Sequence, residues 1–96
     1  MLFMVEMTVN PPHEINKEEF AKLVATEKAR AEELQASGQW RHLWRVACQY
    51  ANVSIFDVES PSALHDIMMS LPLFPFMETN VTPLCRHPSS IRKDDS

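Results

Sequence analysis

The chain has 96 residues, of which 45% are hydrophobic and one is glycine, and its 9 Lys and Arg against 13 Asp and Glu give a formal net charge of −4. An acidic chain without a basic stripe is not expected to bind nucleic acid, and this hydrophobic content is not that of a disordered protein. We expect residues 1–96 to fold as a single domain, too small to be very stable alone and therefore part of a homo-oligomer.

The first part of the chain predicts a strand followed by a long helix. Residues Leu2 to Val9 place an apolar side chain at every second position, which is typical of a strand with one buried face, and Pro11 ends it. Asn16 is a suitable N-cap for a helix from Lys17 to Ser37, and Gly38 is suited to end that helix.

Two strands and a short helix are predicted next. The strands span Trp40 to Ala47 and Gln49 to Val58, and the residues around Cys48 contain no Asn-Gly or Gly pair for a tight turn. Ser60 followed by Pro61 is typical of a helix start, and this helix is expected to continue to residue 70.

The last part of the chain completes a recognisable order of elements. An apolar connector over residues 71–75 is expected to be extended, and a final strand is expected from Phe76 to Leu84. The resulting order βαββαβ matches the ferredoxin-like α+β sandwich, in which two helices cover one face of an antiparallel sheet. We expect another subunit to cover the bare face.

The strand that begins at Trp40 carries aromatic and cationic residues in one alternating pattern. Successive side chains of a strand point to opposite faces, so Trp40 and Trp44 are expected on one face, and Arg41, Leu43 and Arg45 on the other. Arginines beside an apolar side chain favour a site for a small anion.

The long helix has a carboxylate in its apolar stripe. Apolar residues recur at helical spacing from Phe20 to Leu34, and Glu27 occupies a position of this stripe where an aliphatic residue would be expected. Burial raises the pKa of a carboxylate, which is what a general base near neutral pH requires. A structural ion pair with Arg41 or Arg45 is the alternative interpretation.

Other features predict where the protein works. The first ten residues have no basic segment, and Glu6 interrupts their apolar run, so we expect neither a signal peptide nor a membrane span. Cys48 and Cys85 form no CxxC motif and fit the reduced thiols of a cytoplasmic protein. The histidines lack paired metal-ligand spacing, so no metal is expected.

Three segments of the sequence resemble one family. They read WRHLWRVACQYANVSIFDVES, LHDIMMSLPLFPFM and CRHPSSI, and the resemblance extends from Met1 to about Ile91. They resemble muconolactone delta-isomerase of the catechol branch of the β-ketoadipate pathway. This resemblance implies a ferredoxin-like subunit, an isomerase that uses no cofactor, a small anionic lactone as substrate, and a homodecamer. Family members carry glycine at the position of Cys48, from which this chain departs.

The family reaction implies roles for particular residues. Muconolactone becomes 3-oxoadipate enol-lactone when a proton moves from C4 to C2 through a dienolate, and Glu27 is expected to move this proton. Arg41 or Arg45, together with Ser54, is expected to stabilise negative charge on the lactone oxygens. The expected substrate-binding residues are Trp40 as an apolar wall, Arg45, and Arg86 and His87 from the polar tail (residues 86–96) of a neighbouring subunit.

Three other functions stay open on sequence alone. A 5-chloromuconolactone dehalogenase on the same scaffold would begin with the same proton abstraction and then lose chloride. A non-catalytic ferredoxin-like ligand-binding module would hold Glu27 in an ion pair with arginine and have no cavity beside it. A cofactor-free monooxygenase of similar architecture would consume oxygen.

Overall fold

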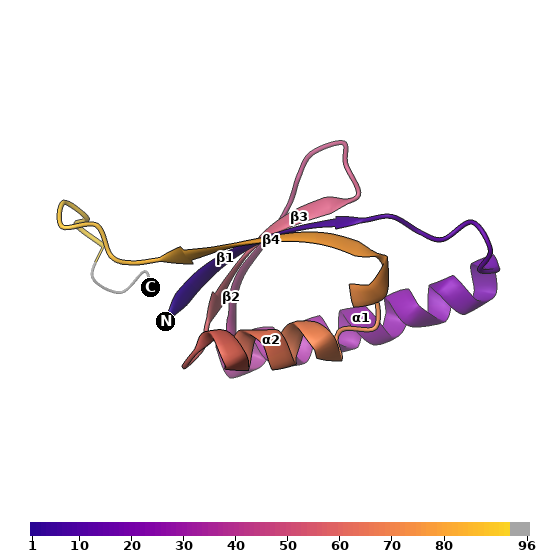
Figure 1. Ribbon diagram of the computed structural model, residues 1–96, viewed down its shortest axis with the longest axis horizontal. Helices are drawn as coiled ribbons and strands as arrows, with labels where there is room; N and C mark the ends of the chain where they lie inside the picture. The colour runs from indigo at the N-terminus through magenta and orange to yellow at the C-terminus, as the bar shows by residue number, and fades with distance from the viewer. Residues whose placement is uncertain (93–96) are drawn as a thin grey trace.

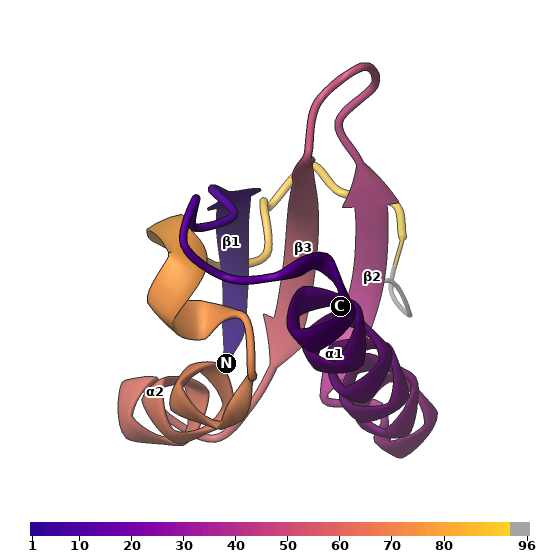
Figure 2. The ribbon, with the colours of Figure 1, turned by 90° about the vertical axis from the view of Figure 1, so that its right-hand side faces the viewer.

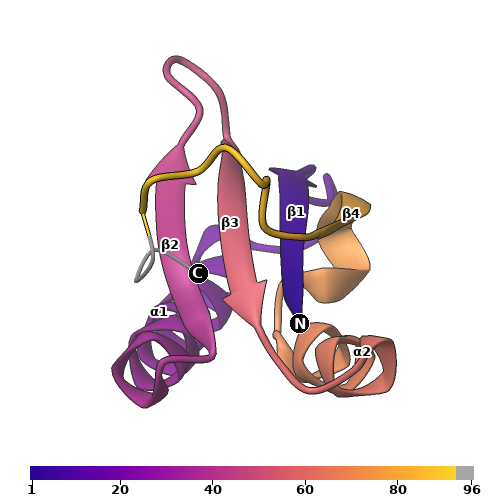
Figure 3. The same cartoon turned by 90° about the vertical axis from the view of Figure 1, so that its left-hand side faces the viewer.

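The computed structural model describes residues 1–92, which form a four-stranded antiparallel sheet with two helices packed on one of its faces (Figure 1). The strand order is β2-β3-β1-β4. Figures 2 and 3 show both helices on the same side of the sheet. The elements are β1 (Leu2–Val9), α1 (Lys17–Ser37), β2 (Trp40–Arg45), β3 (Ala51–Asp57), α2 (Pro61–Ser70), the short 3-10 helix η1 (Phe74–Phe76) and β4 (Met77–Leu84). The ferredoxin-like fold predicted from the sequence is confirmed.

Both helices begin and end at the residues that the sequence indicates. The Asn16 side chain accepts a hydrogen bond from the Glu19 amide at 2.8 Å, and Gly38 ends α1 with a left-handed φ of 87°. Such a conformation is readily adopted by glycine, which has no Cβ. The Ser60 side chain caps α2 by accepting from the Ala63 amide.

The core lies between the sheet and the helices, but α1 covers its part of the sheet unevenly. Within α1, Ala31 and Leu34 are buried, whereas Val24 of the first half is 36% exposed. On α2, Leu64, Ile67 and Met68 are buried. Because the first half of α1 is not sealed against the sheet, space remains between them.

An irregularity in β2 changes which side chains share a face. Trp40 is opposite Phe56, but the register shifts before His42, which is opposite Ile55. This β-bulge inserts Arg41 as an extra residue, so the alternation that places Trp40 with Trp44 is wrong. Trp40 lies on the helix-covered face and is 3% exposed, whereas Trp44 lies on the bare face and is 55% exposed.

The connection between β2 and β3 is longer than the sequence pattern predicts. Strand β2 ends at Arg45 and β3 begins at Ala51, so residues 46–50 form a loop that protrudes beyond the sheet (Figure 2). Cys48 has a left-handed φ of 67° in this loop and is exposed. The loop therefore makes its turn through a residue that disfavours the required backbone conformation.

The apolar connector after α2 is folded rather than extended. Leu71 and Leu73 are buried, and the chain then turns through η1 before β4 begins at Met77. Backbone hydrogen bonds from Phe74 to Leu71 and from Phe76 to Leu73 close these turns. The turn directs the backbone N–H of Leu73 toward α1, where it donates a hydrogen bond to the Glu27 carboxylate.

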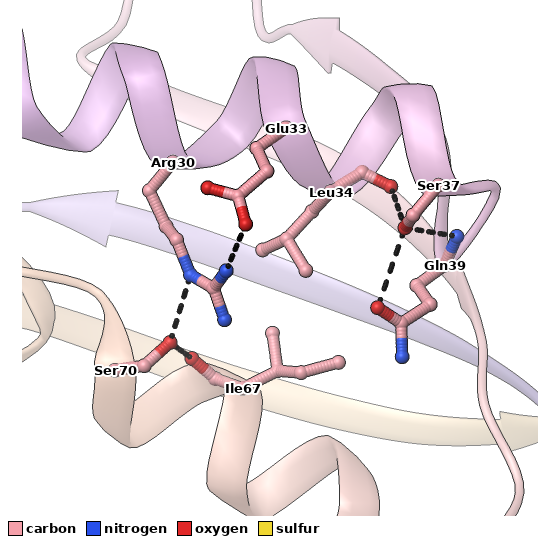
Figure 4. Close-up of polar contacts among 7 residues, drawn as sticks. All are labelled: Arg30, Glu33, Leu34, Ser37, Gln39, Ile67 and Ser70. Atoms are coloured by element: carbon pink, nitrogen blue, oxygen red, sulfur yellow. Dashed lines mark hydrogen bonds and ion pairs between the residues drawn. The ribbon is translucent and has the colours of Figure 1, made fainter.

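Polar contacts fix the end of α1 and therefore the start of β2. Arg30 pairs with Glu33 at 3.1 Å and donates to the Ser70 hydroxyl of α2 at 3.4 Å (Figure 4). The Ser37 hydroxyl donates to the Leu34 backbone carbonyl and accepts from the Gln39 backbone N–H. These contacts hold the chain at the point where it leaves the helix for Trp40.

The segment after β4 extends away from the body of the molecule (Figure 1). Within it, Arg86 donates to the carbonyl oxygens of Arg92 and Ser90 at 2.8 and 3.2 Å. The remainder of the predicted tail, residues 93–96, lies outside the described residues. In residues 1–92, neither helix has the length and apolar character needed to cross a membrane.

Candidate active site

A cavity of about 490 Å³ lies between α1 and the helix-covered face of β2 and β3. Small-molecule sites typically have volumes of about 300–1,000 Å³. Its wall includes Val24, Ala31, Leu43, Leu73 and Met77, which are apolar, and Glu27, Lys28, Arg45, Tyr50 and Asn52, which are polar. The cavity therefore joins a largely apolar surface to a few groups that can hold a polar ligand in one orientation.

A second hollow fits an anion less well. It has a volume of about 570 Å³ and lies near the N-terminus, where Asp57 and Glu59 contribute to its wall. Among residues 1–92, no Lys or Arg lines this hollow, and the Met1 ammonium in its wall is already paired with Asp57. The cavity beside α1 is the better candidate for the small-anion site that the arginines of β2 indicate.

Glu27 lies in the wall of the cavity and is half-buried. One carboxylate oxygen accepts a hydrogen bond from the Leu73 N–H at 2.9 Å. Burial raises the pKa of Glu27 above its ordinary value of 4.5, and the hydrogen bond from Leu73 offsets part of this rise. Among residues 1–92, Glu27 forms no ion pair. Its position fits a proton acceptor, and the arginine pair expected of a purely structural carboxylate is missing from this part of the chain.

Arg45 supplies a cation to the cavity. The bulge brings it to the helix-covered face, opposite Asn52. Its guanidinium lies over the Tyr50 ring at 5.6 Å and donates to the Gln49 carbonyl at 3.4 Å. These contacts orient the guanidinium while leaving further N–H groups to bind a carboxylate.

Ser54 contacts the cavity only indirectly, through its hydrogen bond to Asn52. It is fully buried, does not line the cavity, and its hydroxyl donates to the Asn52 side-chain oxygen at 2.7 Å. With its oxygen held by Ser54, the Asn52 amide nitrogen faces the other way, where it contacts the Met7 sulfur at 3.7 Å. Sulfur is a weak acceptor, so this amide keeps donor capacity at the cavity wall.

Three other residues expected at the site lie elsewhere. Arg41, the bulged residue, is outside the cavity wall and pairs with Asp57 at 3.5 Å. Arg86 and His87 belong to the extended tail segment and do not line the cavity either. Of the residues predicted from the sequence, this chain therefore brings Glu27, Trp40 and Arg45 together in one cavity.

The sequence interpretation missed two groups, Asn52 and the Leu73 N–H. Asn52 has a usable signal, because it is two residues before Ser54 and must share its face in a strand. The Leu73 amide has none, because a backbone donor is marked by no side chain and this contact joins residues 46 apart in the sequence.

The arrangement can carry out proton transfer on a small anionic ligand. A carboxylate of raised pKa acts as a base, a guanidinium binds a carboxylate, and neutral donors stabilise an oxygen that gains negative charge. Apolar walls strengthen each of these interactions by excluding water.

Comparison with known proteins gives a consistent result. The family model described as muconolactone delta-isomerase matches residues 1–90. The chain is 58% identical to muconolactone delta-isomerase 2 of Acinetobacter lwoffii and 53% identical to muconolactone delta-isomerase of Pseudomonas aeruginosa, each over 99% of both chains. It is 45% identical to muconolactone delta-isomerase of Rhodococcus opacus, over 95% of this chain and 98% of that protein.

A solved structure agrees with the sequence relatives. The crystal structure of a muconolactone isomerase at 3.3 Å resolution superimposes with a TM-score of 0.93, at 55% identity and over 100% of both chains. The similarity therefore includes every element that builds the cavity.

Proposed function

The chain belongs to the muconolactone delta-isomerase family and is an isomerase, and we propose that Glu27 catalyses its reaction by moving one proton across a lactone ring. In this proposal the Glu27 carboxylate takes the proton from C4 of muconolactone. The electrons move into a conjugated dienolate, and the carboxylic acid returns the proton at C2 to give the enol-lactone. One base serves both steps because C4 and C2 belong to one small ring.

The observation that carries the proposal is the environment of Glu27. It lines a cavity of suitable volume, its pKa is raised by burial, and in residues 1–92 no cation pairs with it. Pairing with arginine would lower the proton affinity of the carboxylate and weaken it as a base. The same features argue against a non-catalytic module, for which an arginine pair and a filled site are expected.

The substrate's own carboxylate is bound by Arg45 in this proposal. Arg45 is preferred to Arg41 because Arg41 lies outside the cavity wall and pairs with Asp57. A guanidinium meets a carboxylate with two parallel hydrogen bonds, which fixes the orientation of the ring above Glu27.

Neutral groups stabilise the charge that develops on the lactone. The Asn52 amide, oriented by the Ser54 hydroxyl, contributes one donor at the cavity wall. Ser54 is thus a positioning residue rather than a group that touches substrate. The Trp40 ring supplies an apolar wall that keeps the proton affinity of Glu27 high.

We also propose a homo-oligomer, the decamer implied by family resemblance, with residues 1–96 as one domain of each subunit. Apolar side chains populate the bare face of the sheet, and Trp44 among them is 55% exposed. Covering this face would stabilise a small domain. Because the tail segment extends away from its own body, Arg86 and His87 are proposed to complete the cavity of a neighbouring subunit.

The proposed location is the cytoplasm, and the proposed chemistry needs no cofactor. Cys48 and Cys85 are both exposed free thiols. Exposed thiols persist where the surroundings are reducing, as in the cytoplasm. The base, the cation and the neutral donors required for a proton shift are all supplied by the chain.

Glu27→Gln tests the proposed base. The glutamine amide oxygen can still accept from the Leu73 N–H, so the fold is expected to persist while the base is lost. We expect kcat for muconolactone to fall at least about 100-fold, the low end for loss of a general base. The reaction is followed by absorbance, with circular dichroism and sedimentation as checks on fold and assembly.

Glu32→Gln is the matched control. It makes the same chemical change at another carboxylate of the cavity wall, on the same helix, and is expected to keep kcat within about threefold. Unchanged turnover in Glu27→Gln, with fold and assembly intact, would remove Glu27 from the mechanism. Chloride release from 5-chloromuconolactone, measured beside isomerisation, separates the dehalogenase from the isomerase.

A further inference from the structure

Trp40 has a buried hydrogen-bond donor without an acceptor. Its side chain is 3% exposed, and the indole Nε1–H is buried with no partner among residues 1–92. Buried indole N–H groups usually have an acceptor, because leaving one unsatisfied costs about 1–3 kcal/mol. Ser54, the buried polar residue on the neighbouring strand, does have its partner, in Asn52. The unsatisfied indole is therefore an exception that needs an explanation.

The position of Trp40 supplies that explanation. The bulge at Arg41 places Trp40 on the helix-covered face, where its ring packs on Phe56 with centroids 4.7 Å apart. The same residue lines the cavity that contains Glu27. The indole N–H itself has almost no accessible surface, so a ligand oxygen beside Trp40 can meet this donor after a small shift of the side chains that cover it.

The chemistry of the donor restricts the acceptor. An indole N–H is neutral, donates a single hydrogen bond and does not lose its proton near neutral pH. It therefore suits an oxygen that is neutral in the bound ligand and gains charge during reaction, rather than a carboxylate that is charged throughout. The lactone carbonyl oxygen has this character, because it becomes an enolate oxygen once the base has taken the ring proton.

We propose that the Trp40 Nε1–H donates a hydrogen bond to the lactone carbonyl oxygen and strengthens it as the dienolate forms. Trp40 is then a catalytic residue and more than an apolar wall. This inference rests on the proposed function, since it assumes that the lactone occupies the cavity beside Glu27. Arg45 binds the substrate carboxylate, so the cavity divides recognition between a charged donor and a neutral one.

Trp40→Phe removes the N–H but keeps an aromatic ring against Phe56. The probes are two unreactive ligands, a saturated γ-lactone with a carboxymethyl arm and the cyclic ether that lacks only its carbonyl oxygen. If the N–H binds that oxygen, Trp40→Phe weakens the lactone about 10-fold, as expected for one buried hydrogen bond, and weakens the ether less than about twofold. Calorimetric titration of the assembled protein gives both affinities.

Trp44→Phe is the matched control, because it makes the same change at the other tryptophan of the chain, on the bare face. It is expected to bind both ligands like the unmodified protein. In turnover, Trp40→Phe is expected to lower kcat about 100-fold, the typical loss for one oxyanion donor, with KM changing much less.

The results separate this inference from the proposed function. Equal weakening of lactone and ether by Trp40→Phe would overturn the hydrogen bond and leave the role of Glu27 intact. Failure of the unmodified protein to bind either ligand would overturn the cavity as the lactone site, and the donor with it. Selective weakening of the lactone together with the loss of kcat supports the donor.

Discussion

The loop between β2 and β3 contains a backbone strain that one substitution should remove. Cys48 has a φ of 67°, in the left-handed region, and its side chain is exposed. A residue with a Cβ pays about 1–2 kcal/mol for this conformation. Glycine avoids that cost but loses about 0.5–1 kcal/mol more in backbone entropy on folding. We therefore expect Cys48→Gly to raise the free energy of unfolding by about 0.5–1 kcal/mol.

Urea unfolding at one fixed protein concentration measures this effect, because stability depends on concentration in an oligomer. A gain of this size corresponds to a rise of roughly 2–8 °C in Tm for a domain of this length. Cys48→Ala is the control, since it removes the thiol but keeps the Cβ. If Cys48→Ala stabilises as much as Cys48→Gly, or if neither does, the argument from backbone strain is refuted.

Three further predictions concern the cavity. The activity kcat/KM should fall as pH decreases through the raised pKa of Glu27, because the proposed base acts in its carboxylate form. The folded state binds the Glu27 proton more tightly than the unfolded state does, so the free energy of unfolding should decrease as pH rises from 4.5 through the raised pKa. Urea unfolding measured at several pH values should show this decrease in the unmodified protein and not in Glu27→Gln. Arg45→Gln should raise KM about 10- to 100-fold through loss of a charged hydrogen bond, while Arg41→Gln leaves KM unchanged in the same assay. The opposite pattern would show that Arg41, and not Arg45, binds the substrate's carboxylate.

Local signals made much of the fold predictable. Both helices have the predicted bounds because their caps are local: Asn16 and Gly38 delimit α1, and the Ser60-Pro61 pair starts α2. Glu27 was also identifiable, because a carboxylate within an apolar stripe stands out at helical spacing. These features depend on residues that are close together in the sequence.

Features that depend on contacts between distant residues were not predictable in the same way. The connector after α2 reads as an extended apolar run, yet it folds into a turn because Leu71 and Leu73 are buried in the core. Only after that turn forms does the Leu73 N–H meet Glu27. The proton affinity of Glu27 is therefore set partly by a backbone group whose position follows from packing.

The bulge in β2 decides what the cavity contains. In an unbroken strand, Trp40 would point away from the face that carries Leu43 and Arg45, because these differ from it by odd numbers of positions. The extra residue, Arg41, reverses the alternation once, so Trp40 joins Leu43 and Arg45 in the wall while Trp44 is left outside. Trp40, Leu43 and Arg45 can then line the same cavity as Glu27. The irregularity that defeats the sequence pattern is thus what assembles the site.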